Sequence, residues 1–379
     1  MKLKKEFYKL SKDAFEDLLT SIKNSKETIF FLEKTNKPYF YSFSRDTINI
    51  LNDLQQKQNE LDDALNSFSN FARKQIIQSY FIEEVESTNE IENIYSTKHD
   101  IFAVMNRVQG IKDKKIISIV NSYNLLLKSD LKKIKDFDDL DNIYSLLIKD
   151  SLKKDDLPDG KHFRKGPVYI TDGFRNVHNG IEGEELINES MSEFIELFNS
   201  SLGLYERMII GHFLFETIHP YYDGNGRMGR FLFSYGIYHA TGSIFSFKIA
   251  RAFSRKKKAY YKAFKEAGHG REFGSINGFV EDIGRLLIKE IDISLKDIDF
   301  KKNKILEYRR SYGFTKSEEF VFNLLSEASI LSNFGLMNSE IQKETSLSQS
   351  IISKSIKKFK DMDLVETTKI GYYSYHRLK

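Results

Sequence analysis

Apolar and polar positions alternate along most of this chain with the spacing of an amphipathic helix. Apolar residues recur every three or four positions, most clearly over residues 46–76, 205–218 and 231–238. Only four prolines interrupt the 379 residues. Residues 160–183 are the one clear exception before residue 219, because glycines there flank a segment that alternates as strands do. The pattern therefore predicts a mainly α-helical fold with a small β-hairpin.

The last part of the chain has a pattern of its own, with three short helices followed by a hairpin. The segments that carry it are residues 315–328, a short helix from Asn338, a helix from Ser348 to Phe359, and two strands, 364–366 and 372–375, on either side of the Lys369-Ile370-Gly371 turn. Three helices and a hairpin resemble a winged helix. We therefore predict an N-terminal helical region over residues 1–100, a central domain over 101–300 and a winged-helix domain over 312–379.

The second half of this C-terminal part carries a positive balance of charge. From Ser348 to Lys379 the chain has six lysines and one arginine but only three acidic residues. In a DNA-binding winged helix, cations meet phosphates and polar side chains reach base edges. The candidates for these roles are Lys354, Lys357 and Lys358, and Gln349, Ser350 and Ser353. Winged helices also serve as docking or dimer modules, so DNA binding and protein binding both remain open.

Composition excludes several classes of protein. The chain contains no cysteine, which rules out disulfides, thiolate metal sites and a cysteine nucleophile. No apolar run approaches membrane-spanning length, and the chain begins with charged residues instead of an apolar leader. The formal net charge of +4 is small for this length, so a general polyanion partner is not indicated. These features predict a soluble, cytoplasmic protein that does not bind membranes.

Candidate chemistry is concentrated in the twelve residues from His219 to Arg230, between two of the predicted buried helices. A Gly224-Asn225-Gly226 triplet opens the second helix, and backbone amides in such a turn converge on an anion. Arg227 and Arg230 lie three apart and share a helix face, so both can bind phosphate. Asp223 is a hard oxygen ligand suited to Mg²⁺, and His219 can accept a proton near neutral pH. The pattern indicates a phosphate site with a base beside it.

This passage resembles the signature of Fic domains, His-Pro-Phe-x-Asp-Gly-Asn-Gly-Arg-x-x-Arg, with Tyr221 in place of the phenylalanine. A tyrosine keeps the buried ring and adds a hydroxyl that needs a partner. The related Doc kinases carry alanine and lysine where this chain has Gly224 and Gly226, so the phosphate cradle resembles the adenylylating kind. The resemblance covers roughly residues 75–300 and implies the Fic (Fido) helical fold with a small β-hairpin flap.

The resemblance also implies a reaction, adenylyl transfer, in which a protein hydroxyl attacks the α-phosphate of ATP and pyrophosphate leaves. His219 would be the base and Asp223 the ligand of Mg²⁺. The cradle, residues 224–226, would hold the α- and β-phosphates, and Arg227 and Arg230 would bind the β- and γ-phosphates. We therefore predict a nucleotidyltransferase, with ATP as its substrate and Mg²⁺ as its cofactor.

Two further segments match the Fic family outside the signature. Val168-Tyr169-Ile170 lies in residues 166–173, where Fic domains carry the flap that holds a target protein by strand addition. Tyr260 and Tyr261 match the position on a later helix where an aromatic ring lies near the adenine, and ordinary helix packing is the alternative for both. The flap recognises backbone more than side chains, so the target is another protein or this protein itself.

The segment Thr88-Asn89-Glu90-Ile91-Glu92-Asn93 fits the family's inhibitory pattern, Ser/Thr-x-x-x-Glu-Gly/Asn, with Asn93 at its last position. Thr88 and Glu92 lie one helical turn apart and so present one face. The resemblance implies that Glu92 pairs with Arg230 and occupies the arginine that the γ-phosphate needs. The alternative is that Glu92 is one exposed acid among several in this helix, where a surface pair is worth under about 1 kcal/mol.

Three functions fit these features. The first is an autoinhibited protein adenylyltransferase. The second, by resemblance, is the reverse reaction, in which Glu92 orients a water molecule to remove AMP from a modified protein. The third is a DNA-binding regulator whose nucleotide site senses ATP or AMP. An intact His219 favours an enzyme, because a sensor needs no base. A homodimer fits both the inhibitory arrangement and the winged helix.

Overall fold

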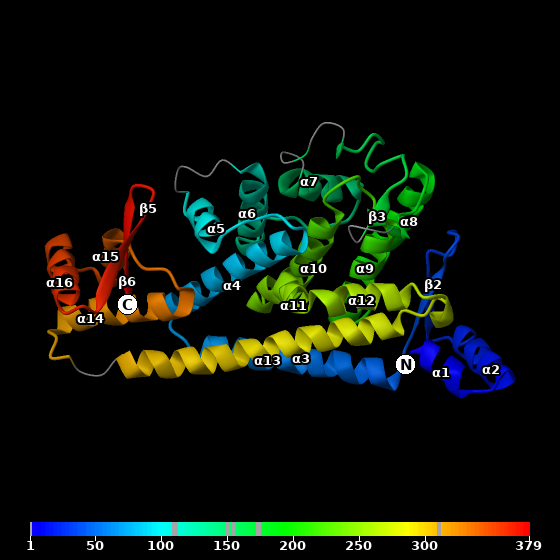
Figure 1. Cartoon of the computed structure of the whole chain (residues 1–379), viewed down its shortest axis with the longest axis horizontal. Coiled ribbons are helices and arrows are strands. Elements are labelled where there is room, and N and C mark those ends of the chain that lie inside the picture. Colours follow the sequence, from blue (N-terminus) through cyan, green and yellow to red (C-terminus); the bar gives the residue numbers. More distant parts are fainter. Residues whose placement is uncertain (1, 108–112, 149–151, 153–155, 172–175, 309–311) are drawn as a thin grey trace.

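The structure is a computed structural model that describes most of the chain. The described residues are 2–107, 113–148, 152, 156–171, 176–308 and 312–379, and for residues 169–171 and 176–179 only the backbone is described. Helices dominate these residues, and their strands form three short, two-stranded antiparallel sheets (Figure 1). The prediction of a mainly α-helical fold is confirmed.

The N-terminal part departs from the prediction of helices alone. Its elements are α1 (Leu3–Lys9), α2 (Lys12–Lys23), β1 (Thr28–Phe31), β2 (Tyr39–Ser42), α3 (Arg45–Asn66) and α4 (Asn70–Ile91). β1 and β2 pair with Thr28 opposite Ser42. Both strands are rich in the aromatic and β-branched residues that favour sheets. Phe40 of β2 also exchanges backbone hydrogen bonds with Gly274 and Ile276, which lie far away in the sequence. The hairpin is therefore held by distant backbone as well as by its own pairing.

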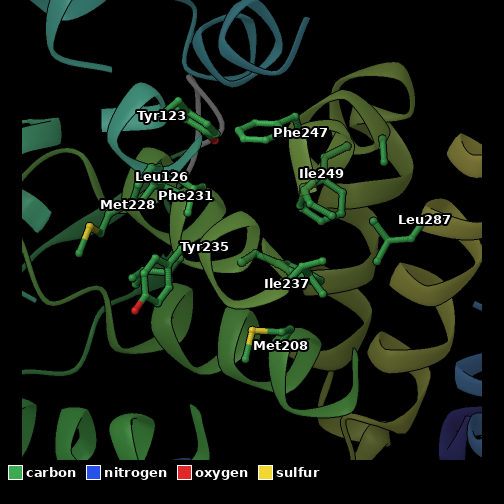
Figure 2. Close-up of a cluster of buried hydrophobic side chains, with 14 of the residues drawn as sticks. Tyr123, Leu126, Met208, Met228, Phe231, Tyr235, Ile237, Phe247, Ile249 and Leu287 are labelled. Carbon is green, nitrogen blue, oxygen red and sulfur yellow. The ribbon is translucent and has the colours of Figure 1, made fainter. Parts of the chain in front are cut away.

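The central part surrounds two buried helices. Its elements are α5 (Lys98–Met105), α6 (Lys114–Leu127), α7 (Phe137–Leu147), β3 (Tyr169–Thr171), β4 (Asn176–Asn179), α8 (Glu184–Phe198), α9 (Leu204–Ile218), α10 (Asn225–Thr241), η3 (Ile244–Lys248), α11 (Ile249–Arg255), α12 (Lys257–Ala267), η4 (Gly270–Glu272) and α13 (Asn277–Tyr308). Most residues of α9 and α10 are buried, so these two helices form the centre of the core. Figure 2 shows Met208 of α9 close to Ile237 of α10. Along one side of the molecule, α13 runs beside α3 (Figure 1).

The C-terminal part contains three helices and a hairpin in the predicted order. Its elements are α14 (Lys316–Ser332), α15 (Asn338–Thr345), α16 (Gln349–Asp361), β5 (Val365–Ile370) and β6 (Tyr373–Leu378). Val321 and Phe359 belong to a separate hydrophobic cluster, which also takes in Phe71 of α4. Phe334 stacks on Phe102 of α5, with the ring centroids 4.0 Å apart. The C-terminal part therefore packs directly on α4 and α5.

Two predictions about partners bear on this fold. Lys354 and Lys357 of α16 are exposed, whereas Lys358 pairs with Glu318, with 2.9 Å between nitrogen and oxygen. One of the three lysines assigned to phosphate is thus engaged within the protein, and DNA binding stays a prediction. Over the described residues, no helix is both long enough and apolar enough to cross a membrane.

Candidate active site

The turn from α9 to α10 carries the predicted base. α9 ends at Ile218, and His219 adopts a left-handed backbone conformation with φ 55° and ψ 61°. Its N–H still donates to the carbonyl of Phe215, 2.9 Å away, so His219 closes the helix. Pro220 cannot continue a helix, because it has no N–H to donate. A residue with a Cβ is costly in this conformation, and the surrounding contacts must hold it there.

The imidazole of His219 is oriented by the last turn of α9. Its Nδ1 lies 3.3 Å from the carbonyl oxygen of Glu216, and its side chain is only 15% exposed. A carbonyl oxygen can only accept, so this contact requires the proton on Nδ1 and leaves the lone pair on Nε2. The ring is therefore held in the tautomer that a general base needs.

Glu216 is a functional candidate that the sequence analysis missed. Its carboxylate Oε2 lies 4.0 Å from Nδ1 of His219, and its Oε1 has no hydrogen-bond partner among the described residues. Burial raises the pKa of this carboxyl to about 7, although the charge of Arg230 opposes the rise. The available signal was one acidic residue in the mostly apolar run between Met208 and Ile218.

The Gly-Asn-Gly triplet forms the start of α10. Gly224 has φ 85°, and a Cβ there would lie 2.6 Å from a methyl of Ile148, so no other residue fits easily. The side chain of Asn225 does not face the site. It accepts from the N–H of Tyr221 at 2.9 Å and donates to the Tyr221 carbonyl at 2.7 Å, which shapes the loop. A Cβ on Gly226 would meet Oε1 of Glu92. The cradle is therefore backbone, with its glycines leaving room for an anion.

Tyr221 stands where the Fic signature has phenylalanine, and its ring is fully buried. It stacks on Tyr144 of α7 with 3.7 Å between centroids and an interplanar angle of 10°. Its hydroxyl has no hydrogen-bond partner among the described residues, so the partner that a buried tyrosine calls for is not supplied there. The hydroxyl of Tyr144 donates to the backbone carbonyl of Asp223 at 3.1 Å. α7 thus supports the loop from outside.

Asp223 lies at the rim of the cradle, with its side chain 49% exposed. Oδ1 accepts from the N–H of Gly224 at 2.6 Å, and Oδ2 lies 3.6 Å from Nη2 of Arg227. Mg²⁺ in phosphate sites is commonly held by one or two carboxylates, with phosphate oxygens and water as the remaining ligands. A half-exposed carboxylate beside an anion cradle fits that requirement.

Both arginines of the signature are buried, but they are used differently. Arg230 is 1% exposed, and its Nη2 donates to Oε1 of Glu92 at 2.7 Å. Its Nε donates to Oγ1 of Thr88 at 2.9 Å. Arg227 is 2% exposed, and its Nη1 has no hydrogen-bond partner among the described residues. Burial lowers the pKa of Arg227, so an anion next to it would be stabilised.

The C-terminal end of α4 brings the predicted regulatory residues to this arginine. α4 ends at Ile91, Glu92 is its C-cap, and Asn93 has φ 56°. A left-handed residue after a helix is usually Gly or Asn, which explains the last position of the inhibitory pattern. Burial raises the pKa of Glu92, but the charge and hydrogen bond of Arg230 outweigh it and hold that pKa below its usual value.

Further contacts tie the same helix end to α12. Nζ of Lys257 donates to the backbone carbonyls of Glu90 and Ile91, at 3.3 and 3.0 Å, and lies 3.5 Å from Oδ1 of Asn93. The last carbonyls of a helix have no partner within the helix, and a cation there is stabilising. Lys257 therefore caps α4 from the neighbouring helix.

The middle of α4 is anchored by two acidic residues of the segment Glu83-Glu84-Val85-Glu86. Glu84 is fully buried and accepts from the N–H groups of Ala250 and Arg251 at 2.8 and 3.3 Å, at the start of α11. Glu83 pairs with Lys248, with 2.6 Å between oxygen and nitrogen. α4 is consequently joined to the catalytic core at its centre as well as at its end.

The two candidate adenine contacts lie in different environments. Tyr260 is 2% exposed, stacks on Phe253 with 4.4 Å between centroids, and its hydroxyl lies 2.8 Å from Nε2 of His212. This burial and the stacking on Phe253 favour helix packing, the alternative given for Tyr260, and its contact with the adenine stays a prediction. Tyr261 is 48% exposed and stays a candidate.

The predicted flap is present as a hairpin. Tyr169 lies opposite Asn179 and Ile170 opposite His178, with an irregularity before Thr171. The carbonyl of Val168 accepts from the N–H of Gly180 at 3.1 Å. Residues 172 and 173 of the predicted flap lie outside the described residues. In the described part of the chain β3 pairs only with β4, which leaves an edge where a further strand can add.

Comparisons with known proteins agree with this geometry. Residues 135–236 match the model of the Fic/DOC family. A Fic family protein from Desulfovibrio desulfuricans G20 is similar in structure, with a TM-score of 0.56 and 17% identity, over 89% of this chain and 97% of that one. Fic-1 from C. elegans gives a TM-score of 0.49 and 15% identity, over 67% and 73% of the two chains.

A Fic domain containing signaling protein from Bacteroides thetaiotaomicron VPI-5482 gives a TM-score of 0.47 and 15% identity, over 66% of this chain and 98% of that one. Among curated proteins, none matches this sequence. The family match spans β3, β4 and the whole passage from His219 to Arg230 but excludes α4 and the C-terminal part. The chain therefore has the fold of a Fic family protein, and its residues 135–236 match the Fic/DOC family model.

Proposed function

We propose that this protein transfers AMP from ATP to a hydroxyl side chain of a target protein, and that Glu92 keeps the resting enzyme inactive. One observation carries the proposal: a carboxylate of the protein itself occupies an anion site beside a base. Oε1 of Glu92 lies 2.7 Å from Arg230, at the N-terminal end of α10, in the room left by Gly226. The positive end of a helix, glycine amides and a buried arginine all favour negative charge at this point.

The same groups are suited to a nucleotide triphosphate. The amides of the cradle, residues 224–226, would hold the α- and β-phosphates, and Arg227 offers a buried Nη1 without a partner in the described residues. Asp223 would hold Mg²⁺, which neutralises phosphate charge when it is bound. Arg230 would bind the terminal phosphate once Glu92 has left it. The half-exposed ring of Tyr261 is the candidate contact for the adenine.

The proposed step uses His219 as a general base. Nε2 accepts the proton of the target hydroxyl, and the hydroxyl oxygen bonds to the α-phosphorus. The bond from that phosphorus to the oxygen bridging the β-phosphate breaks, and pyrophosphate leaves with the electron pair. The products are the AMP ester of the target and pyrophosphate, and no covalent intermediate with the enzyme is needed. The flap, with its unpaired edge in the described residues, would hold the target segment near His219.

Inhibition follows from competition for one arginine. Arg230 is 1% exposed and donates to Thr88 and Glu92 at the same time, so its Nε and Nη2 are already engaged. A γ-phosphate that enters would have to displace the Glu92 carboxylate. ATP that fails to do so would bind with its α-phosphate displaced from the in-line position, and transfer requires that position.

The test follows a label from ATP into protein. Wild type, Glu92→Gly, His219→Ala and the double variant are incubated with Mg²⁺, a cell lysate and ATP labelled on the α-phosphate, and then with ATP labelled on the γ-phosphate. Glu90→Gly is the matched control, because it removes an exposed acid from the same helix end. We expect label from the α-phosphate only, at least a tenfold increase in Glu92→Gly but not in Glu90→Gly, and none in the double variant.

Other outcomes would contradict the proposal. Label from the γ-phosphate would indicate a kinase. No transfer by Glu92→Gly to itself or to lysate proteins, despite measurable ATP binding, would exclude the forward reaction under these conditions. Release of AMP from a previously labelled protein by wild type but not by Glu92→Gln would assign the site to the reverse reaction.

A further inference from the structure

A second buried arginine lies directly behind the base. Arg164 is 0% exposed, and in the described part of the chain no carboxylate forms an ion pair with it. Its guanidinium donates to four backbone carbonyls instead. The contacts are Nε to His219 at 2.8 Å, Nη1 to Gly166 at 2.5 Å, and Nη2 to Ile181 at 2.8 Å and to Ile218 at 3.3 Å. Burying a charge is costly, and acceptors for four of the five N–H groups offset that cost, which indicates that the fold requires an arginine here.

Two of these carbonyls belong to the end of α9. The last carbonyls of a helix lack partners within it, and the negative end of the helix dipole attracts a cation. Arg164 meets this need at Ile218 and at His219, the left-handed residue that serves as the proposed base. The backbone N–H of Arg164 also donates to the carbonyl of Pro220, 3.1 Å away. Arg164 therefore touches three consecutive residues of the turn that carries His219.

The other two carbonyls belong to the two ends of the flap. Gly166 precedes β3 and Ile181 follows β4, so the guanidinium joins both roots of the hairpin. The N–H of Ile181 donates in turn to the carbonyl of Ile218 at 3.1 Å. A Cβ on Gly180 would lie 2.5 Å from Nη2 of Arg164 and 3.1 Å from Cβ of His219, so a glycine is needed for this approach.

We infer that Arg164 is a positioning residue, which holds the backbone of His219 in its left-handed conformation and fixes the flap in register with it. The inference rests on the proposed function, in which the flap must hold the target hydroxyl at a fixed distance from His219. A planar fork with five N–H donors can reach acceptors on both sides at once, and lysine cannot. Among the described residues the guanidinium makes no hydrogen bond to the 224–226 cradle or to Arg230, so we expect nucleotide binding to depend little on it.

A matched control lies at the other end of the same helix. Arg207, in the first turn of α9, donates through Nη1 to the carbonyls of Phe198 and Ser200, at 3.2 and 3.3 Å. It is thus also an arginine on backbone carbonyls at an end of α9, and its removal costs stability without touching the turn at His219. A change in kcat or in amide exchange that Arg164 variants show and Arg207 variants lack is therefore attributed to a changed position of His219 or of the flap.

The first experiment measures transfer from α-labelled ATP in the Glu92→Gly background, as a function of ATP concentration. For Arg164→Ala we expect kcat to fall about 100-fold, the loss associated with a displacement of about 1 Å in an active site, while KM for ATP changes little. Arg164→Lys should recover only a small part of the rate. Arg207→Ala should keep kcat within about twofold of the background. Guanidinium ion, added at a non-denaturing concentration, should restore part of the rate of Arg164→Ala by filling the vacated site.

The second experiment needs no enzymatic activity. Amide hydrogen exchange at Gly180 and Ile181 reports the flap root, because these N–H groups donate to Val168 and Ile218. We expect faster exchange at both in Arg164→Ala but not in Arg207→Ala. If Glu92→Gly transfers nothing, the proposed function fails, and this experiment still decides the role of Arg164. Unchanged kcat, unchanged exchange at the two amides, or equal losses in both alanine variants without rescue by guanidinium would overturn the inference.

Discussion

The middle and the end of α4 are held to the core in different ways. At the middle, Glu84 is completely buried and accepts two backbone N–H groups of α11, and its Oε1 also accepts from the hydroxyl of Ser234 at 3.1 Å. At the end, the Glu92 side chain is 36% exposed and is held to Arg230 by one ion pair. Only side-chain rotation is needed to separate Glu92 from Arg230, whereas Glu84 cannot move without unpairing buried amides.

The difference indicates how the proposed inhibition can be both stable and reversible. A helix fixed at its centre delivers its terminal carboxylate to one position, because the helix itself does not drift. The terminal residue can still leave, because no backbone of the core depends on it. Release of the enzyme therefore requires only that the Glu92 side chain leave Arg230, and the helix itself stays in place.

The largest effect on stability is expected from substitution of Glu84, in the middle of α4. Glu84→Ala should lower the free energy of unfolding by about 2–5 kcal/mol, because two backbone N–H groups and the hydroxyls of Ser234 and Tyr123 lose their acceptor. Urea denaturation measures this loss. Glu86→Gln is the control, since the partly exposed Glu86 makes only a long pair of 3.9 Å with Lys98, and it should change stability by less than about 0.5 kcal/mol. Equal stability of the two variants would contradict the anchoring role of Glu84.

The stabilisation from Glu84 in the middle of α4 and that from Glu92 at its end should depend on pH with opposite sign. Burial raises the pKa of Glu84 to about 7, so the folded state binds its proton more tightly than the unfolded state. Stability from this group is full below the unfolded value near 4.5 and is lost as pH rises through about 7. The pKa of Glu92 is lowered, so its stabilisation is present above 4.5 and is lost only on acidification.

Urea titrations between pH 5 and 8 test this contrast. Wild type should lose on the order of 1–3 kcal/mol across the interval, and Glu84→Gln should flatten the curve. Glu216, whose pKa is also raised to about 7, contributes in the same direction, so Glu216→Gln should remove a further part. The ratio of the activity of Glu92→Gly to that of wild type should stay constant over the same interval. A ratio that falls toward pH 5 would show that Glu92 is protonated there.

At the end of α4, activity and stability should separate. Glu92→Gln keeps the size of the side chain but removes its charge, so we expect about a tenfold gain in transfer, equivalent to 1.4 kcal/mol, with the urea midpoint nearly unchanged. Glu90→Gln, on the exposed side of the same turn, keeps an acceptor for the hydroxyl of Ser254 and does not touch Arg230, so transfer should not change and the urea midpoint should change little. A Glu92→Gln protein that unfolds as readily as Glu84→Ala would remove the distinction between the middle and the end of α4.

The smallest effect on transfer is expected from substitution of Lys257, which caps the end of α4. Lys257→Ala removes the donor to the carbonyls of Glu90 and Ile91, which should loosen the last turn of α4 without removing Glu92. We expect transfer to rise about threefold, in line with the roughly 0.3–1 kcal/mol of a cation at a helix end. Lys258→Ala, at an exposed neighbour, is the control. A fall in activity would show that Lys257 serves the reaction instead of restraining it.

The local parts of the site could be predicted from the sequence because local chemistry determines them. The break between α9 and α10 follows from Pro220 and from Gly224, whose φ of 85° only glycine adopts freely. The flap follows from alternation near Val168, and the helical facing of Thr88 and Glu92 follows from their spacing.

The parts that were missed depend on contacts between distant segments. Glu84 sits in a run of acids that has the composition of a surface, and only the packing of α11 onto α4 shows that it is buried. The contacts of Arg164 could not be predicted, because its partners are backbone carbonyls, which every residue has. Tyr260 was predicted equally as a base contact and as a core residue, and only its stacking on Phe253, from a different helix, favours the core. The β1–β2 hairpin is held to Gly274, far along the chain.

The missing side chain of Gly226 leaves the space that the Glu92 carboxylate occupies beside Arg230. Glu92 is an anion on a tether, so its effective concentration at that volume is set by the geometry of α4 and not by the amount of protein. Dilution cannot release it, and a separate copy of the chain cannot supply more of it. If the proposed function holds, the fraction of active enzyme does not depend on protein concentration. Nucleotide, or a partner that acts on the last turn of α4, would change it.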